Sequence, residues 1–271
     1  MYEKFYALKE NPFNITSDPE YFFSSTRHCE AFSNLTYGIE NRKGILVVSG
    51  EIGTGKTTLC RMLLSKLDHR TKTAFILNPS FSNLQLLQLI LKDLGIQSKA
   101  CNKFDLINAL NEFLLNETRL GNNVVLIIDE AQNLHVKQLE QIRLLSNLET
   151  VKEKLLQIIL VGQPELNDKL KLTDLRQLNQ RVTVRYHISP LERHELSGYI
   201  QHRIAIASFD SQNPKPQFTQ KAIETIYEHS GGTPRMVNIL CDRSLLAGYT
   251  DDVYTITEKI LYRCIQEVVL Q

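Results

Sequence analysis

Short, unbroken apolar runs recur along the first two thirds of the chain, and segments with helical periodicity lie between them. The runs cover residues 44–49, 73–77, 124–128, 157–161 and 182–188. Because they do not alternate with polar positions, they are typical of strands in a parallel sheet that is covered on both faces. The helical segments cover about residues 56–68, 83–94, 104–119 and 135–149. Strands that alternate with helices predict a doubly wound α/β domain.

The pattern changes after Pro190. Four segments have helical spacing, near residues 191–208, 219–230, 234–248 and 257–269, and no further run predicts a strand. A polar loop is expected between the first two, at residues 210–216. We therefore predict an α/β domain over residues 1–190 and a small all-helical domain over residues 191–271.

Composition narrows the class of protein. Of the 271 residues, 42% are hydrophobic and 23% are charged, which is ordinary for a globular chain and excludes extensive disorder. The net charge of +1 argues against a broad basic surface for nucleic acid but leaves a local patch open. Five cysteines without a C-x-x-C pair do not indicate disulfides or a zinc site. With no membrane-length apolar run and no apolar N-terminal region, we expect a soluble, cytoplasmic protein.

The eight residues from Gly50 to Thr57, GEIGTGKT, fit the phosphate-loop pattern G-x-x-x-x-G-K-[ST] between a predicted strand and a predicted helix. Glycines let the backbone wrap around phosphates, and the helix N-terminus adds favourable partial charge. Lys56 would meet the β- and γ-phosphates, and the Thr57 hydroxyl would bind Mg²⁺. The predicted nucleotide-binding residues here are Gly50, Glu51, Ile52, Gly53, Thr54, Gly55, Lys56, Thr57 and Thr58.

Two acidic residues follow the most apolar strand. Asp129 and Glu130 come directly after residues 124–128, and parallel strands end at the same edge of a sheet as the phosphate loop. Asp129 is then a candidate to hold Mg²⁺ or a metal-bound water, and Glu130 to polarise an attacking water, which favours hydrolysis over binding alone. The alternative is a strand that simply ends in two solvated acids.

These residues, with the fourth strand and the GGTPR stretch at residues 231–235, resemble those of AAA+ ATPases. More specific similarities lie in NPFNITSDP (11–19), the stretch 49–63, LQIILVGQPEL (156–166) and LRQLNQR (175–181). Together they resemble the ExeA/GspA (general secretion pathway protein A) type, including the MshM-like proteins, and more distantly the TniB/TnsC transposition ATPases. The resemblance implies a P-loop AAA+ sheet sandwiched by helices, with a helical lid domain after it.

The resemblance also implies roles for single residues. Gln163 corresponds to the sensor 1 residue, with an ordinary polar strand end as the alternative. Arg235 corresponds to the sensor 2 arginine of the lid, with an exposed helix-start arginine as the alternative. Pro12 and Phe13 lie in a segment that resembles the adenine side of the family's site, although Phe13 fits a core position equally well.

A further arginine would act across a subunit interface. Arg181 and Arg176 precede the fifth strand, and we favour Arg181 as the finger that reaches a neighbour's γ-phosphate; a surface salt bridge is the alternative for both. The resemblance implies ATP and Mg²⁺ as cofactors and ATP hydrolysis as the activity.

Three functions are compatible with these features. The first is a Mg²⁺-dependent AAA+ ATPase that forms a homo-oligomeric ring or filament and acts as a switch or remodelling factor in secretion or pilus assembly. The second is a DNA-associated ATPase that regulates a transposase or integrase, which the net charge of +1 does not favour. The third is a nucleotide-sensing adaptor with little or no hydrolysis. A protein partner is expected in each case, and any membrane association would come through that partner.

Overall fold

The structure is a computed structural model that describes residues 1–97, 100, 102–151, 153–209 and 216–269. The chain divides into two compact units. The first, which we call the sheet unit, contains Cys29–Ile52 and Leu59–Ile188. The second, the helical unit, contains Met1–His28, Gly53–Thr58 and Ser189–Gln271. Most of the loop predicted at residues 210–216 lies outside the described residues.

The sheet unit is built on five parallel strands, as the apolar runs predict. They are β1 (Ile45–Gly50), β2 (Thr71–Ile76), β3 (Asn123–Ile128), β4 (Gln157–Gly162) and β5 (Val182–Ile188). Their order in the sheet is β2-β3-β4-β1-β5, and every neighbouring pair is parallel. The predicted α/β class is confirmed, and the central strands β3, β4 and β1 are almost completely buried because helices cover both faces.

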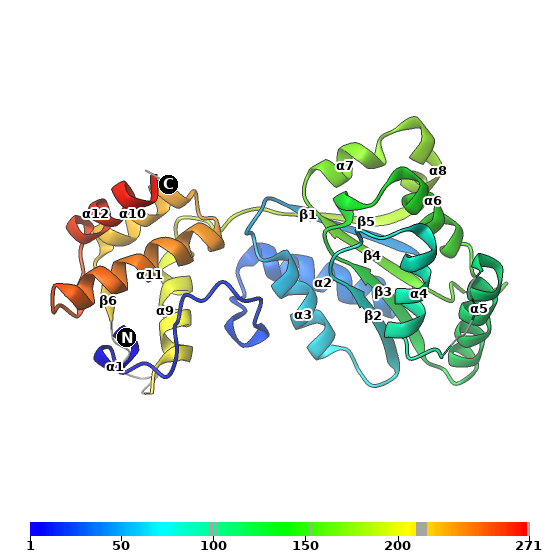
Figure 1. Cartoon of the computed structure of the whole chain (residues 1–271), viewed down its shortest axis with the longest axis horizontal. Helices are drawn as coiled ribbons and strands as arrows, with labels where there is room; N and C mark the ends of the chain where they lie inside the picture. Colours follow the sequence, from blue (N-terminus) through cyan, green and yellow to red (C-terminus); the bar gives the residue numbers. More distant parts are fainter. Residues whose placement is uncertain (98–99, 101, 152, 210–215, 270–271) are drawn as a thin grey trace. The chain divides into compact units, whose positions relative to one another are not determined.

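Helices cover the sheet on two sides (Figure 1). On one face α4 (Asn83–Asp93), α5 (Lys103–Arg119) and α6 (Val136–Leu145) pack their leucines and isoleucines on alternate residues of the strands. On the other face lie α2 (Thr26–Glu40) and α3 (Lys56–Lys66). A Cβ on Gly38 of α2 would lie 2.1 Å from the Cδ2 atom of Leu46, so this glycine allows α2 to pack closely on β1.

Three helices of the sheet unit have no counterpart in the sequence prediction. Residues 26–40 form α2 although they include Ser33, Asn34, Thr36 and Gly38, which are weak helix formers. This helix is stabilised by the burial of its apolar face, which includes Leu35. The other two, α7 (Glu165–Leu170) and α8 (Arg176–Gln180), are too short to produce a recognisable period.

The helical unit contains the four helices predicted after residue 190. They are α9 (Leu196–Ala207), α10 (Gln220–Ser230), α11 (Pro234–Thr250) and α12 (Glu258–Val269). The expectation of no further strand is wrong, because β6 (Gln217–Phe218) pairs in parallel with β7 (Thr255–Ile256). Two-residue strands are too short to produce an apolar run in the sequence.

The N-terminal segment packs on the helices of this unit. The hydroxyl of the fully buried Tyr6 donates to the carbonyl oxygens of Leu245 and Val253, both at 3.1 Å. Arg203 of α9 donates from Nε to the Pro12 carbonyl oxygen at 2.6 Å and from Nη2 to that of Asn14 at 2.9 Å. These bonds lie within the helical unit, to which Met1–His28 belongs. The domain boundary at residue 190 stays a prediction. No helix in the described part of the chain is both long and apolar enough to cross a membrane.

Candidate functional site

The carboxyl ends of β1, β3 and β4 meet at one edge of the sheet. Ser49 of β1 pairs with Gly162 of β4, and Ile128 of β3 pairs with Leu160 of β4. Gly50 is the last residue of β1, and Asp129 and Gln163 directly follow β3 and β4. Residues from three separate stretches of the sequence are therefore brought together at the edge where ligands bind in open parallel sheets.

The acidic pair has a constrained backbone. The Asp129 side chain is buried at 1% exposure, and its Oδ1 atom accepts the backbone N–H of Glu130 at 2.9 Å. The Asp129 N–H donates to the Ile76 carbonyl oxygen of β2 at 2.8 Å, which continues the pairing of β3 with β2. Glu130 has a φ of +51°, in the left-handed region that a residue with a side chain rarely adopts. Such a conformation persists only where the surroundings hold it, and it is common at functional sites.

Two glutamine side chains hold the carboxylate of Glu130. Its Oε2 atom accepts hydrogen bonds from Gln132 Nε2 at 2.5 Å and from Gln163 Nε2 at 3.3 Å. Gln132 Oε1 also accepts the backbone N–H of Gln163 at 3.0 Å. A Cβ on Gly162 would lie 2.7 Å from that same Oε1 atom, so the glycine leaves room for this arrangement. The sensor residue predicted at Gln163 is thus bonded directly to the predicted water-polarising residue.

The turn after Glu130 is fixed as well. Residues Ala131–Asn133 form a 3-10 turn, and Lys169 of α7 donates its Nζ hydrogens to the carbonyl oxygens of Gln132 and Leu134 at 2.5 and 2.9 Å. The side chain of Gln132 therefore extends from a backbone segment that is hydrogen-bonded to the neighbouring helix α7.

The phosphate loop has the backbone that its sequence pattern predicts. Gly53 and Gly55 have φ values of +81° and +89°, which a residue with a Cβ would adopt only with strain. Lys56 is the first residue of α3 and is buried at 6% exposure. Thr57 follows it in the first turn, where the helix carries partial positive charge. This geometry fits the binding of a nucleotide phosphate chain.

Two residues of the helical unit contact the loop. The backbone N–H of Arg235, in the first turn of α11, donates to the Gly53 carbonyl oxygen at 3.2 Å. A Cβ on Gly53 would lie 2.5 Å from the Cβ of Arg235. The buried ring of His28 lies 2.9 Å from the Thr54 carbonyl oxygen through its Nε2 atom. The predicted sensor 2 residue thus lies directly against the phosphate loop.

The donor set near the acidic pair fits Mg²⁺. Among the residues that the structure describes, no group of three or more His, Cys, Asp or Glu side chains is placed to hold a metal ion. Mg²⁺ does not need such a cage, because it is commonly bound by one or two protein oxygens together with water and substrate phosphates. The buried carboxylate of Asp129 supplies an oxygen of this kind.

Arg181 lies at the other edge of the sheet. Residue pairing runs from Ile45 with Val182 to Gly50 with Ile188, so Arg181 precedes β5 at its amino end. At about 3.3 Å per residue, the strand separates Arg181 from the level of Gly50 by about 20 Å. Arg181 is half-buried and Arg176, which begins α8, is exposed. Because of this separation, Arg181 cannot reach a phosphate bound at the carboxyl edge of its own sheet.

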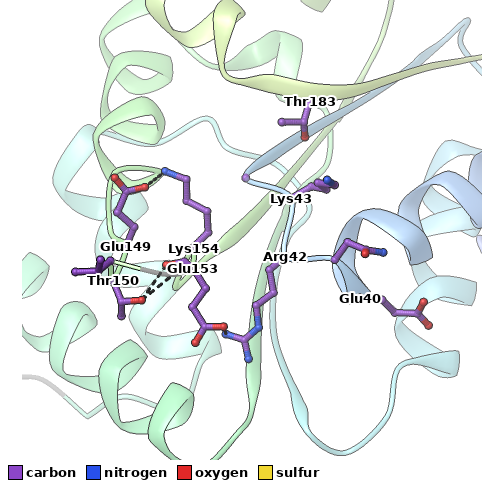
Figure 2. Close-up of a pocket in the computed structure, with 11 residues that line it drawn as sticks. Glu40, Arg42, Lys43, Glu149, Thr150, Glu153, Lys154 and Thr183 are labelled. Atoms are coloured by element: carbon purple, nitrogen blue, oxygen red, sulfur yellow. Dashed lines mark hydrogen bonds and ion pairs between the residues drawn. The ribbon is translucent and has the colours of Figure 1, made fainter.

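A cleft of about 620 Å³ opens at this amino-terminal edge (Figure 2). Its walls carry both signs of charge: Arg42 lies 3.2 Å from Glu153, and Glu149 is paired with Lys154. The hydrogen bond and the charge of Lys154 lower the pKa of Glu149, and the positive charge of Arg181 lowers the same pKa further. The cleft is therefore a salt-bridged surface beside Arg181, and it lies at the edge opposite to the acidic pair.

The structure also bears on the adenine-side prediction. Phe13 is buried at 2% exposure in the core of the helical unit, where its ring meets the ring of Phe218 edge-to-face at 6.2 Å. Pro12 is buried beside it. Phe13 thus has the core position that the sequence analysis kept open, and a contact with adenine stays a prediction for both residues.

Sequence analysis missed two residues of these networks. Gln132 lies two positions after Glu130, in a short turn. A turn has no sequence periodicity, so no pattern identifies this glutamine as a functional residue. His28 lies 22 positions before the phosphate loop begins, and its contact with the loop depends on tertiary structure.

The chain is similar to known proteins in sequence and in fold. Residues 39–170 match the family model described as AAA domain. Over 250 residues the chain is 42% identical to General secretion pathway protein A of Aeromonas hydrophila, and the match covers 92% of this chain and 45% of that protein. The chain therefore spans less than half the length of this relative.

Solved structures share the fold. The ORC2 protein of Aeropyrum pernix, solved in ADPNP-ADP complexes, matches with a TM-score of 0.67 and 15% identity, covering 96% of this chain and 72% of that one. The ORC1 protein of the same organism, solved in complex with DNA, matches with a TM-score of 0.67 and 15% identity, covering 91% and 66%. At these identities the likeness establishes the fold, which is the AAA+ P-loop fold that the sequence predicts.

Proposed function

We propose that the protein is a Mg²⁺-dependent ATPase that works as an oligomeric switch or remodelling factor, since residues 39–170 match the family model described as AAA domain. The observation that carries the proposal is the Glu130 carboxylate. It is held by Gln132 and Gln163 at the sheet edge from which the phosphate loop begins. A protein that only bound nucleotide would not need a carboxylate held in this way.

The phosphate loop would bind the nucleotide. Its N–H groups and the N-terminus of α3 would cradle the phosphates, and the Lys56 ammonium would meet the β- and γ-phosphates. Thr57 through its hydroxyl and Asp129 through its carboxylate are the proposed Mg²⁺ residues. The bound Mg²⁺ would neutralise charge on the β- and γ-phosphate oxygens. Arg235, which touches Gly53 through its backbone, would extend its guanidinium to the nucleotide as sensor 2.

Glu130 and Gln163 would perform the hydrolytic step. The Glu130 carboxylate would accept a proton from the attacking water as the water oxygen bonds to the γ-phosphorus. The bond from the γ-phosphorus to the β,γ-bridging oxygen would break at the same time, and ADP would leave. Gln132 and Gln163 both bond to Oε2 of this carboxylate, which fixes its direction. Gln163 would also sense the γ-phosphate, so its amide links the presence of ATP to the position of the base.

The arginine finger would come from a second copy of the chain. Arg181 lies about 20 Å along the sheet from the level of its own Gly50, so any action on a transferring phosphate requires the site of a neighbour. Trans arginines stabilise the charge of the transition state in other phosphoryl-transfer systems. We therefore propose a ring or filament in which each site is completed by Arg181, with Arg176 as the second candidate.

ATP turnover measured against protein concentration tests this proposal. Turnover per chain should rise steeply as the protein assembles, because an isolated chain lacks the finger. A rate per chain that is independent of concentration, in a protein shown to assemble over the same range, would contradict the shared site. Absence of any ATP binding would contradict the proposal as a whole.

The cellular role that we propose is in a secretion or pilus-assembly machine. Its support is the 42% identity to a protein named General secretion pathway protein A, of which this chain covers 45%. The protein would act at the cytoplasmic side and reach the membrane through a partner. The alternative is a DNA-associated ATPase, for which the support is a shared fold with an ORC1 protein solved in complex with DNA.

DNA binding discriminates between the two roles. A DNA-associated ATPase should bind duplex DNA with an affinity that falls steeply with salt and should change its turnover when DNA is added. A secretion factor should do neither at physiological ionic strength. The net charge of +1 favours the second outcome.

A further inference from the structure

A buried histidine contacts the phosphate loop from outside. His28 lies in the first turn of α2 at 5% exposure, and its Nε2 atom is 2.9 Å from the Thr54 carbonyl oxygen. Its Nδ1 atom is 2.7 Å from the hydroxyl of Ser25, which is buried at 3% exposure. The same hydroxyl accepts the backbone N–H of His28 at 3.3 Å. Both ring nitrogens therefore have partners, and the ring has one orientation.

These partners determine the tautomer. A carbonyl oxygen can only accept, so Nε2 carries the hydrogen that bonds to Thr54. In a neutral ring Nδ1 is then the acceptor, and the Ser25 hydroxyl donates to it. Burial lowers the pKa of His28 below its ordinary value, against the opposing effects of the Thr54 hydrogen bond and of the Glu195 carboxylate. A neutral ring contributes a directed hydrogen bond to the loop and no charge.

The hydrogen bond has a consequence for the direction of the loop amides. In a trans peptide the C=O and the following N–H point in opposite directions. Because the Thr54 carbonyl oxygen faces His28, the N–H of Gly55 points away from His28. The Gly53 carbonyl oxygen faces the N–H of Arg235 in the same way, so the N–H of Thr54 points away from α11. Two successive carbonyl groups are thus held from outside the loop.

The fit of the ring against the loop is close. A Cβ on Gly55 would lie 3.1 Å from His28 Nε2, and Gly55 already has a φ of +89°. The ring edge therefore lies against the bare Cα of the loop, and a side chain at position 55 would push it away. The ring of Phe22 also packs edge-to-face on His28, with centroids 5.6 Å apart.

We propose that His28 is a positioning residue of the phosphate loop, which holds the Thr54 carbonyl outward and so aims the N–H of Gly55 at the bound phosphates. The inference rests on the proposed function, since it assigns the loop to a nucleotide. His28 itself does not contact the phosphates. It acts through the orientation of one peptide group, which would otherwise have to be ordered when the nucleotide binds.

Two substitutions distinguish the roles of the two ring nitrogens of His28. The amide nitrogen of His28→Gln can occupy the position of Nε2 and donate to Thr54, whereas His28→Asn reaches only the position of Nδ1. We expect the affinity for Mg·ATP to stay within about threefold of wild type in His28→Gln and to fall by about tenfold in His28→Asn. The loss should appear mainly in KM, with kcat changed less, because the loop binds both ground state and transition state. Equal affinities in the two variants would overturn the proposal.

Hydrogen–deuterium exchange without nucleotide provides a second measurement. Amides of residues 50–58 should exchange faster in His28→Asn than in wild type and at the wild-type rate in His28→Gln. Unchanged exchange in His28→Asn would overturn the positioning role. This test needs no nucleotide, so it is separate from the test of the proposed function, which absence of ATP binding in wild type would contradict. If His28→Asn does not fold, Ser25→Ala serves instead, since it removes the hydroxyl that orients the ring. Loop exchange and ATP affinity identical to wild type in Ser25→Ala would equally overturn the proposal.

Discussion

Replacement of Glu130 by glutamine tests the chemistry with little change of shape. The amide oxygen introduced at this position can still accept the hydrogen bonds that Gln132 and Gln163 now donate to Oε2. The amide cannot accept a proton from water. Binding and chemistry should therefore separate in Glu130→Gln, with Mg·ATP bound nearly as in wild type and turnover strongly reduced.

The substitution should have a large effect on turnover and a small effect on stability. A general base contributes about 10²–10⁴-fold to the rate, so turnover should fall at least about a hundredfold, which corresponds to about 2.7 kcal/mol of activation free energy. Stability should change far less. Two hydrogen bonds lose a charged acceptor but keep a neutral one, which costs at most about 1 kcal/mol each, and Glu130 is only half-buried. A melting temperature within about 5 °C of wild type is expected.

Single-turnover hydrolysis with excess enzyme, together with equilibrium ATP binding and thermal unfolding, measures the three quantities separately. Gln132→Ala is the matched control, because it keeps the carboxylate and removes one of the two groups that orient it. It should lose less turnover than Glu130→Gln. Wild-type turnover in Glu130→Gln would refute the assignment of Glu130, and an equal loss of ATP affinity and turnover would place its role in binding instead.

Three further outcomes are expected. Lys56→Ala should lose tight ATP binding while keeping its fold, because its ammonium meets the phosphates; unchanged affinity by calorimetry would contradict the phosphate-loop assignment. Arg181→Ala should bind ATP and hydrolyse little, and mixing it with Lys56→Ala should restore part of the activity; a mixture that co-assembles and stays inactive would redirect the finger to Arg176. Gly53→Ala should be more destabilised than Gly121→Ala in thermal unfolding. Both glycines have a positive φ, so the backbone strain is shared, but only the Cβ at position 53 would overlap Arg235. The strain shared by both should be about 1–2 kcal/mol, and equal losses would argue against a close packing of Arg235 on Gly53.

The strands and the motif residues could be predicted from the sequence because their causes are local. An unbroken apolar run such as residues 124–128 is typical of a strand buried on both faces. In a parallel sheet, the two acids that follow such a strand lie at the carboxyl edge. The glycines of residues 50–55 and the lysine that follows them are required by the approach of a backbone to phosphate. The helices of the last 80 or so residues follow from their periodicity.

Helix α2 could not be predicted in this way. It includes several residues with weak intrinsic preference for a helix, and it packs on β1 with Gly38 against Leu46. The same is true of the two-residue strands β6 and β7, which exist because two distant segments meet.

The sequence alone thus determined the class of fold, the phosphate loop and the acidic pair, since each depends on residues that are adjacent in the chain. Only the tertiary structure decided which groups surround them. Gln132 and Gln163 hold Glu130 because β3 and β4 are neighbours in the sheet, and Arg181 lies far from its own Gly50 because β5 runs parallel to β1. His28 reaches Thr54 because the start of α2 packs on the loop. Hydrogen bonds of this kind join residues from different parts of the chain, and their geometry exists only once the elements have packed.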